Sequence, residues 1–446
     1  MAPPSSLAID TERRLTIACL TLLLAGVVVG IVVPAGPGWD FANFYDTGAR
    51  VAAGQLRDIY DPSTLIRGRS PQGAMAFWGT PLSALFYTPM AWLAPGTALV
   101  LFKIQNTLAS FAALLLLYTH NRRFAGDSPE AQSRFAALFA FLALIYQPFW
   151  TVYRVGGQTT PTVVLLLTVG LLTHTAGKRL WTVLCLVAAV LVKPAFLPIL
   201  GILVLVSGVR FLLVAALVGS AVALASVAFL GWPIHQEFLA VLARGATKSF
   251  PWFYNSSLYV WLDALAVIVP AAPGGGLPPL VRAVVIAAKL LVLLLAVLIF
   301  VRSRTQPWAP AARRHFDFLM AVSFCLLLSQ TVWEHYLAAL FLPLAYLVAV
   351  RHRLGRSASA LIWAVFAFAV WQNLILVNML RDSFRWESFA GVLAGGLLKS
   401  GPLLLFLILL VRYRDAVGAT YALPVWGTSA VPASALGAVP ARACTR

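Results

Sequence analysis

Long apolar stretches alternate with short polar segments along most of the chain. The clearest of them approach or exceed the roughly 20 residues that a helix needs to cross the hydrocarbon of a bilayer. These four are 15–34, 211–230, 280–301 and 361–380. Eight further stretches continue the pattern: 96–118, 135–151, 161–175, 180–192, 195–206, 316–333, 336–350 and 389–411. The pattern predicts an all-α polytopic membrane protein with about twelve transmembrane helices.

Composition supports the same class. Hydrophobic residues make up 61% of the chain and charged residues only 11%, whereas a soluble domain carries about 25% charged residues. A normal water-exposed surface cannot be assembled from so few charges, so lipid is expected to cover most of the protein. Of the four cysteines, Cys444 lies in the tail and the others lie in apolar stretches. No disulfide framework is expected from that distribution.

The net charge of +18 comes from short Lys and Arg clusters between the apolar stretches. This placement is typical of cytoplasmic loops in membrane proteins. It contains no basic patch interleaved with base-stacking aromatic residues, so no nucleic-acid partner is predicted. The clusters orient the chain with both termini in the cytoplasm.

The predicted orientation assigns the residues to a transmembrane domain, its outer loops and a cytoplasmic tail. Residues 1–413 form the predicted transmembrane domain, with outer loops at 36–80 and 231–279, and residues 414–446 form a loosely ordered cytoplasmic tail. Within the second loop, the apolar stretch 258–270 is too short for a span, so an interfacial or re-entrant helix is expected. Most of the other polar groups that orientation does not explain then lie on the outer side: Asp40, Asp46, Asp58, Asp61, Gln158, Lys193, Arg244, Lys248, Asn255, Glu334, His335, Asp382 and Glu387.

The first outer loop is rich in candidate chemistry. Phe41, Phe44, Tyr45 and Gly48 recur at helical spacing, which predicts an amphipathic helix lying on the membrane. Asp40 directly precedes this pattern. A carboxylate held between lipid and water can have a raised pKa and act as a general base. Asp40 could equally be the N-cap of the helix, because Asp is a favoured N-cap.

Two outer segments are candidates for binding an anion. The run 156–161 (Gly-Gly-Gln-Thr-Thr-Pro) opens a predicted helix, whose free N–H groups favour phosphate; a plain turn capped by Thr159 or Thr160 fits as well. Lys193-Pro194 breaks a pair of short apolar stretches. An ionisable residue at such a break is a functional candidate, although a lysine that snorkels to the interface is the alternative.

Two further outer segments combine charge with aromatic rings. Residues 333–336 (Trp-Glu-His-Tyr) offer an imidazole that can hold a phosphate oxygen or relay a proton, although the rings could simply form an interfacial belt. Arg244 and Lys248 precede the aromatic and amide run 250–257. That composition suits a sugar phosphate.

Three of these islands together resemble the polyprenol-phosphate-dependent enzymes of glycosyltransferase family 87. The first is Asp40-Phe41 through Tyr45, Gly54 and Tyr60-Asp61-Pro62; the second is Gly157-Gln158 followed by Lys193-Pro194; the third is Trp333-Glu334-His335-Tyr336, with Tyr336 where the family has a second histidine. The chain is similar in this respect to mycobacterial mannosyl- and arabinofuranosyltransferases. The resemblance implies the GT-C membrane fold, without a metal or other cofactor.

The resemblance also implies a mechanism and roles for residues. Asp40 is the expected general base for attack by an acceptor hydroxyl on a polyprenyl-phosphate sugar, with inversion at the anomeric carbon. The acceptor is expected to be a glycan or glycolipid, and the site is expected at the outer face of a bacterial inner membrane. The expected substrate-binding residues are Lys193, His335, Gln158, Arg244, Lys248, Glu334, Tyr45 and Asp61, of which Arg244 and Lys248 rest only on their charge and their side of the membrane. The alternatives are a transporter or flippase of a lipid-linked glycan, a diphosphate-glycan polymerase or ligase, and a noncatalytic scaffold.

Overall fold

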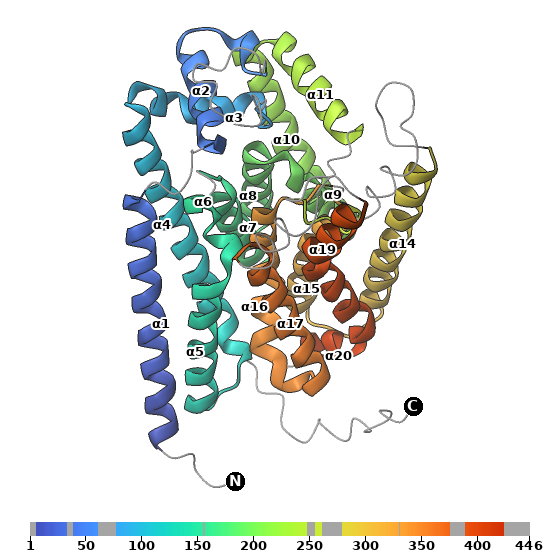
Figure 1. The fold of residues 1–446 in the computed structure, drawn as a ribbon. Coiled ribbons are helices and arrows are strands. Elements are labelled where there is room, and N and C mark those ends of the chain that lie inside the picture. The colour runs from blue at the N-terminus through green and yellow to red at the C-terminus, as the bar shows by residue number, and fades with distance from the viewer. Residues whose placement is uncertain are drawn as a thin grey trace.

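The chain folds into a bundle of helices (Figure 1). The computed structural model describes residues 6–33, 39–60, 77–154, 157–247, 255–260, 279–329, 331–374 and 389–422. Within these ranges every regular element is a helix, apart from one isolated antiparallel bridge between Asn255 and Trp333. The predicted all-α class is confirmed for this part of the chain.

Helices occupy the apolar stretches of the sequence. They are α1 (Ser6–Val32), α4 (Pro95–Asn121), α5 (Pro129–Ile145), α7 (Thr160–Thr175), α8 (Arg179–Val192), α9 (Leu197–Ser207), α10 (Val209–Leu230), α14 (Pro279–Arg304), α15 (Pro310–Leu328), α16 (Phe341–Val350), α17 (Arg356–Leu374) and α19 (Phe389–Arg412). Six helical segments in the described ranges are long and apolar enough to cross a membrane, and four further apolar helices are shorter. The chain is thus a multi-spanning membrane protein, and the total of about twelve spans stays a prediction.

Proline and hydroxyl side chains set where several helices begin. Proline occupies the first turn of α4, α5, α7 and α15, where no intrahelical N–H bond is lost. The Ser128 hydroxyl caps α5 by accepting from the Ala131 N–H at 3.2 Å. The Thr80 hydroxyl caps the short helix α3 (Pro81–Tyr87) and also donates to the Leu191 carbonyl at 2.9 Å. Thr80 therefore ties the end of the first loop to the end of α8.

Burial separates a protein core from surfaces that face lipid. Every residue of α16 is buried, and α7 lies between α4, α8 and α15. By contrast, α10 and α14 expose large apolar side chains such as Leu217, Phe229, Leu290 and Leu294. A soluble protein does not leave so much continuous apolar surface in water, so these faces are expected to contact the hydrocarbon.

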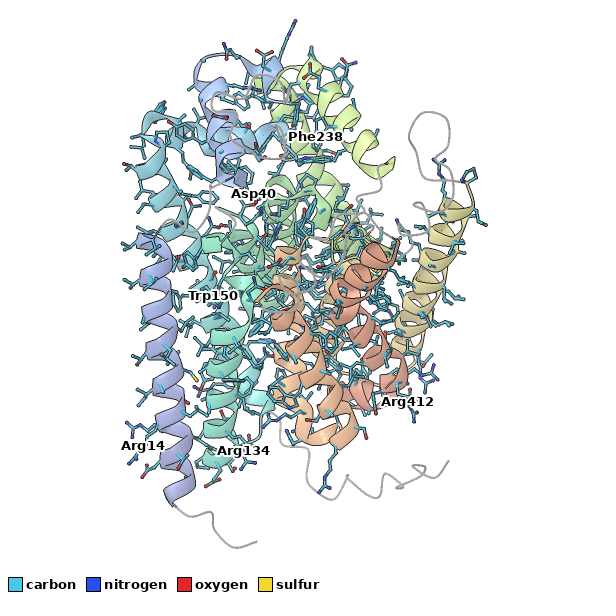
Figure 2. All side chains as sticks on the ribbon, in the orientation of Figure 1. Arg14, Asp40, Arg134, Trp150, Phe238 and Arg412 are labelled. Carbon is cyan, nitrogen blue, oxygen red and sulfur yellow. The ribbon has the colours of Figure 1, made fainter. Side chains whose placement is uncertain are left out.

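The two ends of the bundle differ in character. At one end lie α2 (Trp39–Ala52), α3 and α11 (Trp232–Thr247), shown at the top of Figure 1. We refer to it as the Asp40 end, because Asp40 begins there on α2. Arg14, Arg134 and Arg412 lie at the opposite end of the bundle, which we refer to as the arginine end (Figure 2). The sequence prediction that basic loops and Asp40 lie on opposite sides agrees with this arrangement.

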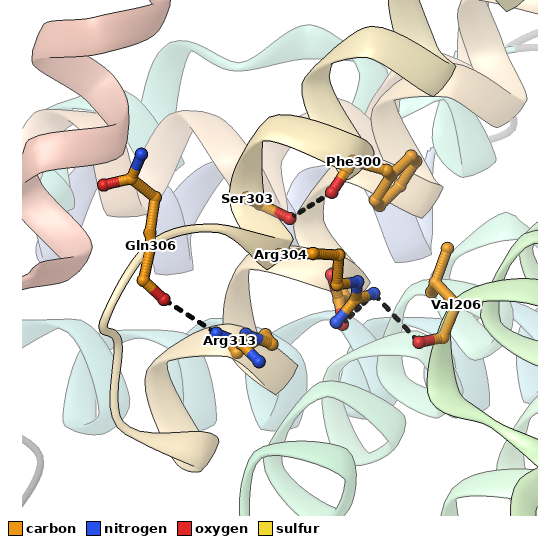
Figure 3. A network of polar contacts seen from close by, with 7 residues as sticks. Val206, Phe300, Ser303, Arg304, Gln306 and Arg313 are labelled. Atoms are coloured by element: carbon orange, nitrogen blue, oxygen red, sulfur yellow. Dashed lines mark hydrogen bonds and ion pairs between the residues drawn. The ribbon is translucent and has the colours of Figure 1, made fainter.

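Arginine side chains also hold the loop between α14 and α15 at the arginine end (Figure 3). Arg304 donates to the Val206 carbonyl and to the Asp317 carboxylate, both at 2.9 Å. Arg313 donates to the Gln306 carbonyl at 2.8 Å, and the Ser303 hydroxyl donates to the Phe300 carbonyl at 2.7 Å (Figure 3). These arginines therefore have structural partners in addition to any role in orientation.

The chain stays ordered beyond the expected end of the membrane domain. Residues 414–446 were expected to be loose, but α20 (Arg414–Ala419) and η9 (Thr420–Ala422) follow directly. Tyr421 is buried, and its ring stacks on Tyr346 with 4.7 Å between centroids. One aromatic side chain thus anchors a segment whose composition alone gives no helical period. Residues 423–446 lie outside the described ranges.

Candidate active site

Four polar side chains from separate parts of the chain meet at the Asp40 end. Asp40 is on α2, Gln158 directly precedes α7, Lys193 lies between α8 and the short helix η6 (Pro194–Phe196), and His335 is in η7 (Glu334–Leu340). The Asp40 carboxylate accepts a hydrogen bond from Gln158 Nε2. Lys193 Nζ donates to Gln158 Oε1 at 2.8 Å and lies 2.9 Å from His335 Nε2. All four belong to the predicted site, and the structure brings them together.

The contacts fix how each group is used. Gln158 has to turn its N–H₂ toward the carboxylate and its carbonyl oxygen toward the ammonium, because the reverse orientation would oppose like groups. Lys193 has three N–H donors and uses two of them, so His335 Nε2 accepts and the imidazole is neutral with its proton on Nδ1. One N–H of Lys193 has no hydrogen-bond partner among the described residues. It can therefore donate to a ligand.

Burial shifts both charges toward neutrality. Desolvation raises the pKa of Asp40, opposed by the nearby charge of Lys193 and by the hydrogen bond from Gln158. Desolvation likewise lowers the pKa of Lys193, opposed by the charge of Asp40. The second oxygen of Asp40 has no hydrogen-bond partner in the described ranges. Asp40 is thus a carboxylate of raised basicity with one oxygen available.

Close packing of α2 against the turn at 157–158 brings Asp40 to Gln158. Gly157 has a φ of +97°, and a Cβ built on it would lie 2.6 Å from the Cβ of Phe41. Only glycine permits both that backbone conformation and that approach. Phe41 is buried beside Phe102 of α4, with ring centroids 5.3 Å apart.

The structure does not make Asp40 the N-cap of this helix. α2 begins at Trp39, so Asp40 lies within the first turn, and its carboxylate is bonded to Gln158 instead. The predicted helix exists, but its aromatic side packs on protein: Phe44 stacks on Tyr87 with 4.8 Å between ring centroids. The Tyr45 hydroxyl donates to the Leu93 carbonyl at 2.8 Å, so while this bond is formed the hydroxyl can offer a substrate only an acceptor.

Lys193 is held inside the protein and does not snorkel. Its backbone is extended between α8 and η6, with φ −140° and ψ 98°, so the predicted break at Lys193-Pro194 is confirmed. The side chain is buried, and its ammonium lies 4.7 Å from the centre of the Tyr336 ring. A cation over an aromatic face is stabilised where water is excluded. Tyr336 therefore contributes a π face at this place.

The start of α7 is an anion-binding candidate. Thr159 and Thr160 are buried, and neither hydroxyl has a hydrogen-bond partner among the described residues. Thr159 occupies the N-cap position of α7, but its side chain makes no capping hydrogen bond, so the expected hydroxyl cap is absent here. Orphaned hydroxyls beside the free N–H groups of a helix N-terminus suit a phosphate oxygen. Gly156 lies outside the described ranges.

Glu334 belongs to a second polar group. Its carboxylate accepts from Gln147 Nε2 at 2.7 Å and lies 3.7 Å from Lys399 Nζ of α19. Sequence reasoning predicted Glu334 as a substrate ligand and did not identify Gln147 or Lys399. The signal for Lys399 was available, because it is the single charged residue within the apolar run 389–411 and such residues have a functional or structural partner.

Residues of the second outer loop are less fully described. Arg244 lies on α11 and its side chain is not described, and Lys248 and Asp61 fall outside the described ranges, as do the aromatic residues at 250 and 252–254. Asn255 is buried, and its side-chain oxygen accepts from the Val332 N–H at 2.9 Å and the Ser257 N–H at 3.1 Å. This amide, expected to suit a sugar, instead fastens the loop to the segment before Glu334.

No group of three or more His, Cys, Asp or Glu side chains is placed to hold a metal ion within the part of the chain that the structure describes. The site as described is a carboxylate, an amide, an ammonium and an imidazole.

Fold and site together define a multi-spanning membrane protein with a largely buried cluster of charged and polar side chains at one end. The sequence model of glycosyltransferase family 87 matches residues 77–330, more than half of the chain, and the chain belongs to this family. It is therefore a membrane glycosyltransferase. Gln158 and Lys193 lie within the matched residues, whereas Asp40 precedes them and His335 follows them. A search of curated proteins finds no match.

Proposed function

We propose that this glycosyltransferase transfers a sugar from a polyprenyl-phosphate donor to a hydroxyl acceptor, with Asp40 as the general base. The observation that carries the proposal is the chain of contacts from Asp40 through Gln158 to Lys193 and His335. A single amide separates a carboxylate of raised pKa from a cation with a free donor. Transfer from a phosphate donor needs both groups, one to take a proton and one to stabilise the leaving phosphate.

The chemistry follows from these positions. The acceptor O–H gives its proton to the free oxygen of Asp40 while its oxygen bonds to the anomeric carbon. The bond from that carbon to the phosphate oxygen breaks, and the electron pair leaves with the polyprenyl phosphate. One displacement from the face opposite the phosphate inverts the configuration.

Positive groups stabilise the negative charge that develops on the leaving phosphate. The free N–H of Lys193 and the N-terminus of α7 with Thr159 and Thr160 are the proposed phosphate contacts. His335 holds the Lys193 ammonium in place and has Nδ1–H as a further donor. Interactions that strengthen as charge develops lower the barrier more than they tighten donor binding.

The outer face of the membrane is the proposed side of the reaction. Arg14, Arg134 and Arg412 gather at the end opposite Asp40 (Figure 2), and Arg-rich loops favour the cytoplasm. A donor carried by a lipid reaches such a site from within the bilayer. Buried apolar surroundings on the protein side would exclude water, which would otherwise compete with the acceptor.

Replacing Asp40 with Asn tests the base directly. Asp40→Asn keeps the size of the side chain and removes the proton acceptor, so transfer by the purified protein should fall about 10²- to 10⁴-fold. The measurement is glycosidic product formed from a panel of polyprenyl-phosphate sugars. Asp58→Asn, an exposed acid near the end of the same loop segment, should keep wild-type activity.

Two results would count against the proposal. Wild-type transfer by Asp40→Asn would remove Asp40 from the chemistry. Movement of the lipid-linked sugar across the membrane by the wild type, with no glycosidic bond formed, would instead place the site in transport.

A further inference from the structure

Glu334 and His335 are neighbours in the chain but make contacts in different parts of the protein. His335 faces Lys193 at the proposed phosphate site, 2.9 Å from its ammonium. Glu334 faces Gln147 of η5 (Gln147–Phe149) and Lys399 of α19. The direction in which the η7 turn presents His335 therefore depends on what holds Glu334.

Because Glu334 is buried, the position of its carboxylate depends strongly on the groups that accompany it. Glu334 has 6% of its surface exposed and Lys399 has none. A carboxylate so deep in the protein is costly unless a cation and hydrogen-bond donors accompany it. Lys399 supplies the opposite charge and Gln147 supplies the hydrogen bond, at 3.7 Å and 2.7 Å respectively.

The alternative cation for Glu334 is at the site itself. Lys193 contacts the ring of His335, which follows Glu334 in the chain. In a variant with a neutral residue at 399, Glu334 would be a buried carboxylate that has lost the ammonium 3.7 Å from it. Turning the η7 segment so that Glu334 approaches Lys193 would then replace part of the lost charge interaction, at the expense of the His335 contact and of the donor that Lys193 keeps for phosphate.

We propose that Lys399, with Gln147, is a positioning element of the site: it holds Glu334 away from Lys193 so that His335 faces the phosphate position. Lys399 acts through Glu334 and does not touch the substrate. The role of the phosphate position rests on the proposed function. The orientation of His335 by Lys399 does not depend on it.

The test reads His335 directly, independently of transfer. The full-length protein, labelled with ¹⁵N-histidine and embedded in a bilayer, gives imidazole signals from six histidines, and loss of one signal in His335→Asn assigns it. In Lys399→Met the His335 Nε2 signal should move away from its wild-type position, because the hydrogen bond with Lys193 is lost or weakened. Lys399→Arg preserves the ion pair and should leave the signal unchanged.

Removing the second charge should restore the geometry. In Glu334→Gln/Lys399→Met the carboxylate charge is removed together with the ammonium and the bond from Gln147 can still form, so the His335 signal should return toward its wild-type position. Lys289→Met is the matched control: its ammonium lies 5.4 Å from the Tyr259 ring, and the signal should stay in place. If Lys399→Met does not fold, Lys399→Gln, which is also neutral, is measured in its place.

Transfer kinetics give the functional counterpart. In Lys399→Met, kcat should fall about tenfold, and the double variant should recover most of it, since residues in one network couple strongly. A wild-type His335 signal in Lys399→Met overturns this inference whatever the protein transfers. If the His335 signal moves in Lys399→Met but the wild-type protein forms no product from any polyprenyl-phosphate sugar, the positioning role is supported and the proposed donor is overturned.

Discussion

Gln158 determines how the two charges of the site relate to each other. Its amide donates to Asp40 and accepts from Lys193, so the carboxylate and the ammonium are connected through one neutral group. A direct ion pair would occupy the third N–H of Lys193 and lower the basicity of Asp40. The amide keeps the base and the phosphate contact separate, yet within one network.

Replacing Gln158 with Leu should therefore lower transfer. Gln158→Leu leaves both charges without their shared partner, and kcat/KM should fall about 10- to 100-fold, the cost of one or two hydrogen bonds to charged groups. The measurement is initial rate with the donor that the wild type uses. Gln132→Leu at the arginine end serves as the control, and an unchanged rate in Gln158→Leu would show that the bridge is dispensable.

The pH profile of transfer should be narrower than ordinary carboxyl and amino groups would give. Asp40 must be ionised to act as a base, and since its pKa is raised, the rate should climb with pH through a value above the usual ~3.9. Lys193 must be protonated to donate to the phosphate. Since its pKa is lowered, the rate should fall as the pH rises through a value below the usual ~10.4.

Variants assign the two limbs of this profile, measured as kcat/KM against pH. Lys193→Arg keeps its charge at all accessible pH values, so the alkaline limb should move to higher pH even if the rate falls. Asp40→Asn should remove the acid limb from the residual activity. An acid limb that persists in Asp40→Asn would belong to another group.

The contact between α2 and the turn before α7 depends on a single glycine. A Cβ at residue 157 would meet the Cβ of Phe41 at 2.6 Å and would carry a φ of +97°. The Phe41 backbone cannot move away easily, because the Phe41 ring is packed on Phe102 of α4. The position of α2, which carries Asp40, thus depends on residue 157 having no side chain.

Gly157→Ala should move α2 and lose transfer. The strained backbone and the clash together are expected to cost about 1–3 kcal/mol, visible as a lower denaturation temperature, with a large loss of kcat. Gly219→Ala on α10 has nothing within 4 Å of its new Cβ and should be neutral or slightly stabilising. Wild-type activity in Gly157→Ala would show that the register of α2 is not critical.

The distribution of arginines predicts the sidedness of the whole molecule. In a variant without native cysteines, a cysteine replacing the exposed Gln55 at the Asp40 end should react with a membrane-impermeant reagent added to intact cells. A cysteine replacing the exposed Arg356, in a basic loop, should react only after the membrane is opened. The reverse pattern would place the site in the cytoplasm.

Hydropathy along the chain was sufficient to predict the membrane class and the position of the long apolar helices, because a span needs only length and apolarity. It did not predict the shorter helices α3, α11 and α20. Residue types at breaks in this pattern also identified Asp40, Gln158, Lys193 and His335 as candidates. Such breaks require a reason in a membrane, where unpaired polar groups are costly.

What the sequence could not determine is which polar group each candidate meets. Glu334 and His335 stand side by side in the chain, yet one binds Lys399 and the other Lys193. Asn255 and Tyr45 have suitable side chains for a sugar and use them on neighbouring backbone. Partners 35 to 187 residues apart are selected by helix packing, and only the tertiary structure decides that packing, because local pattern carries no information about which helices meet.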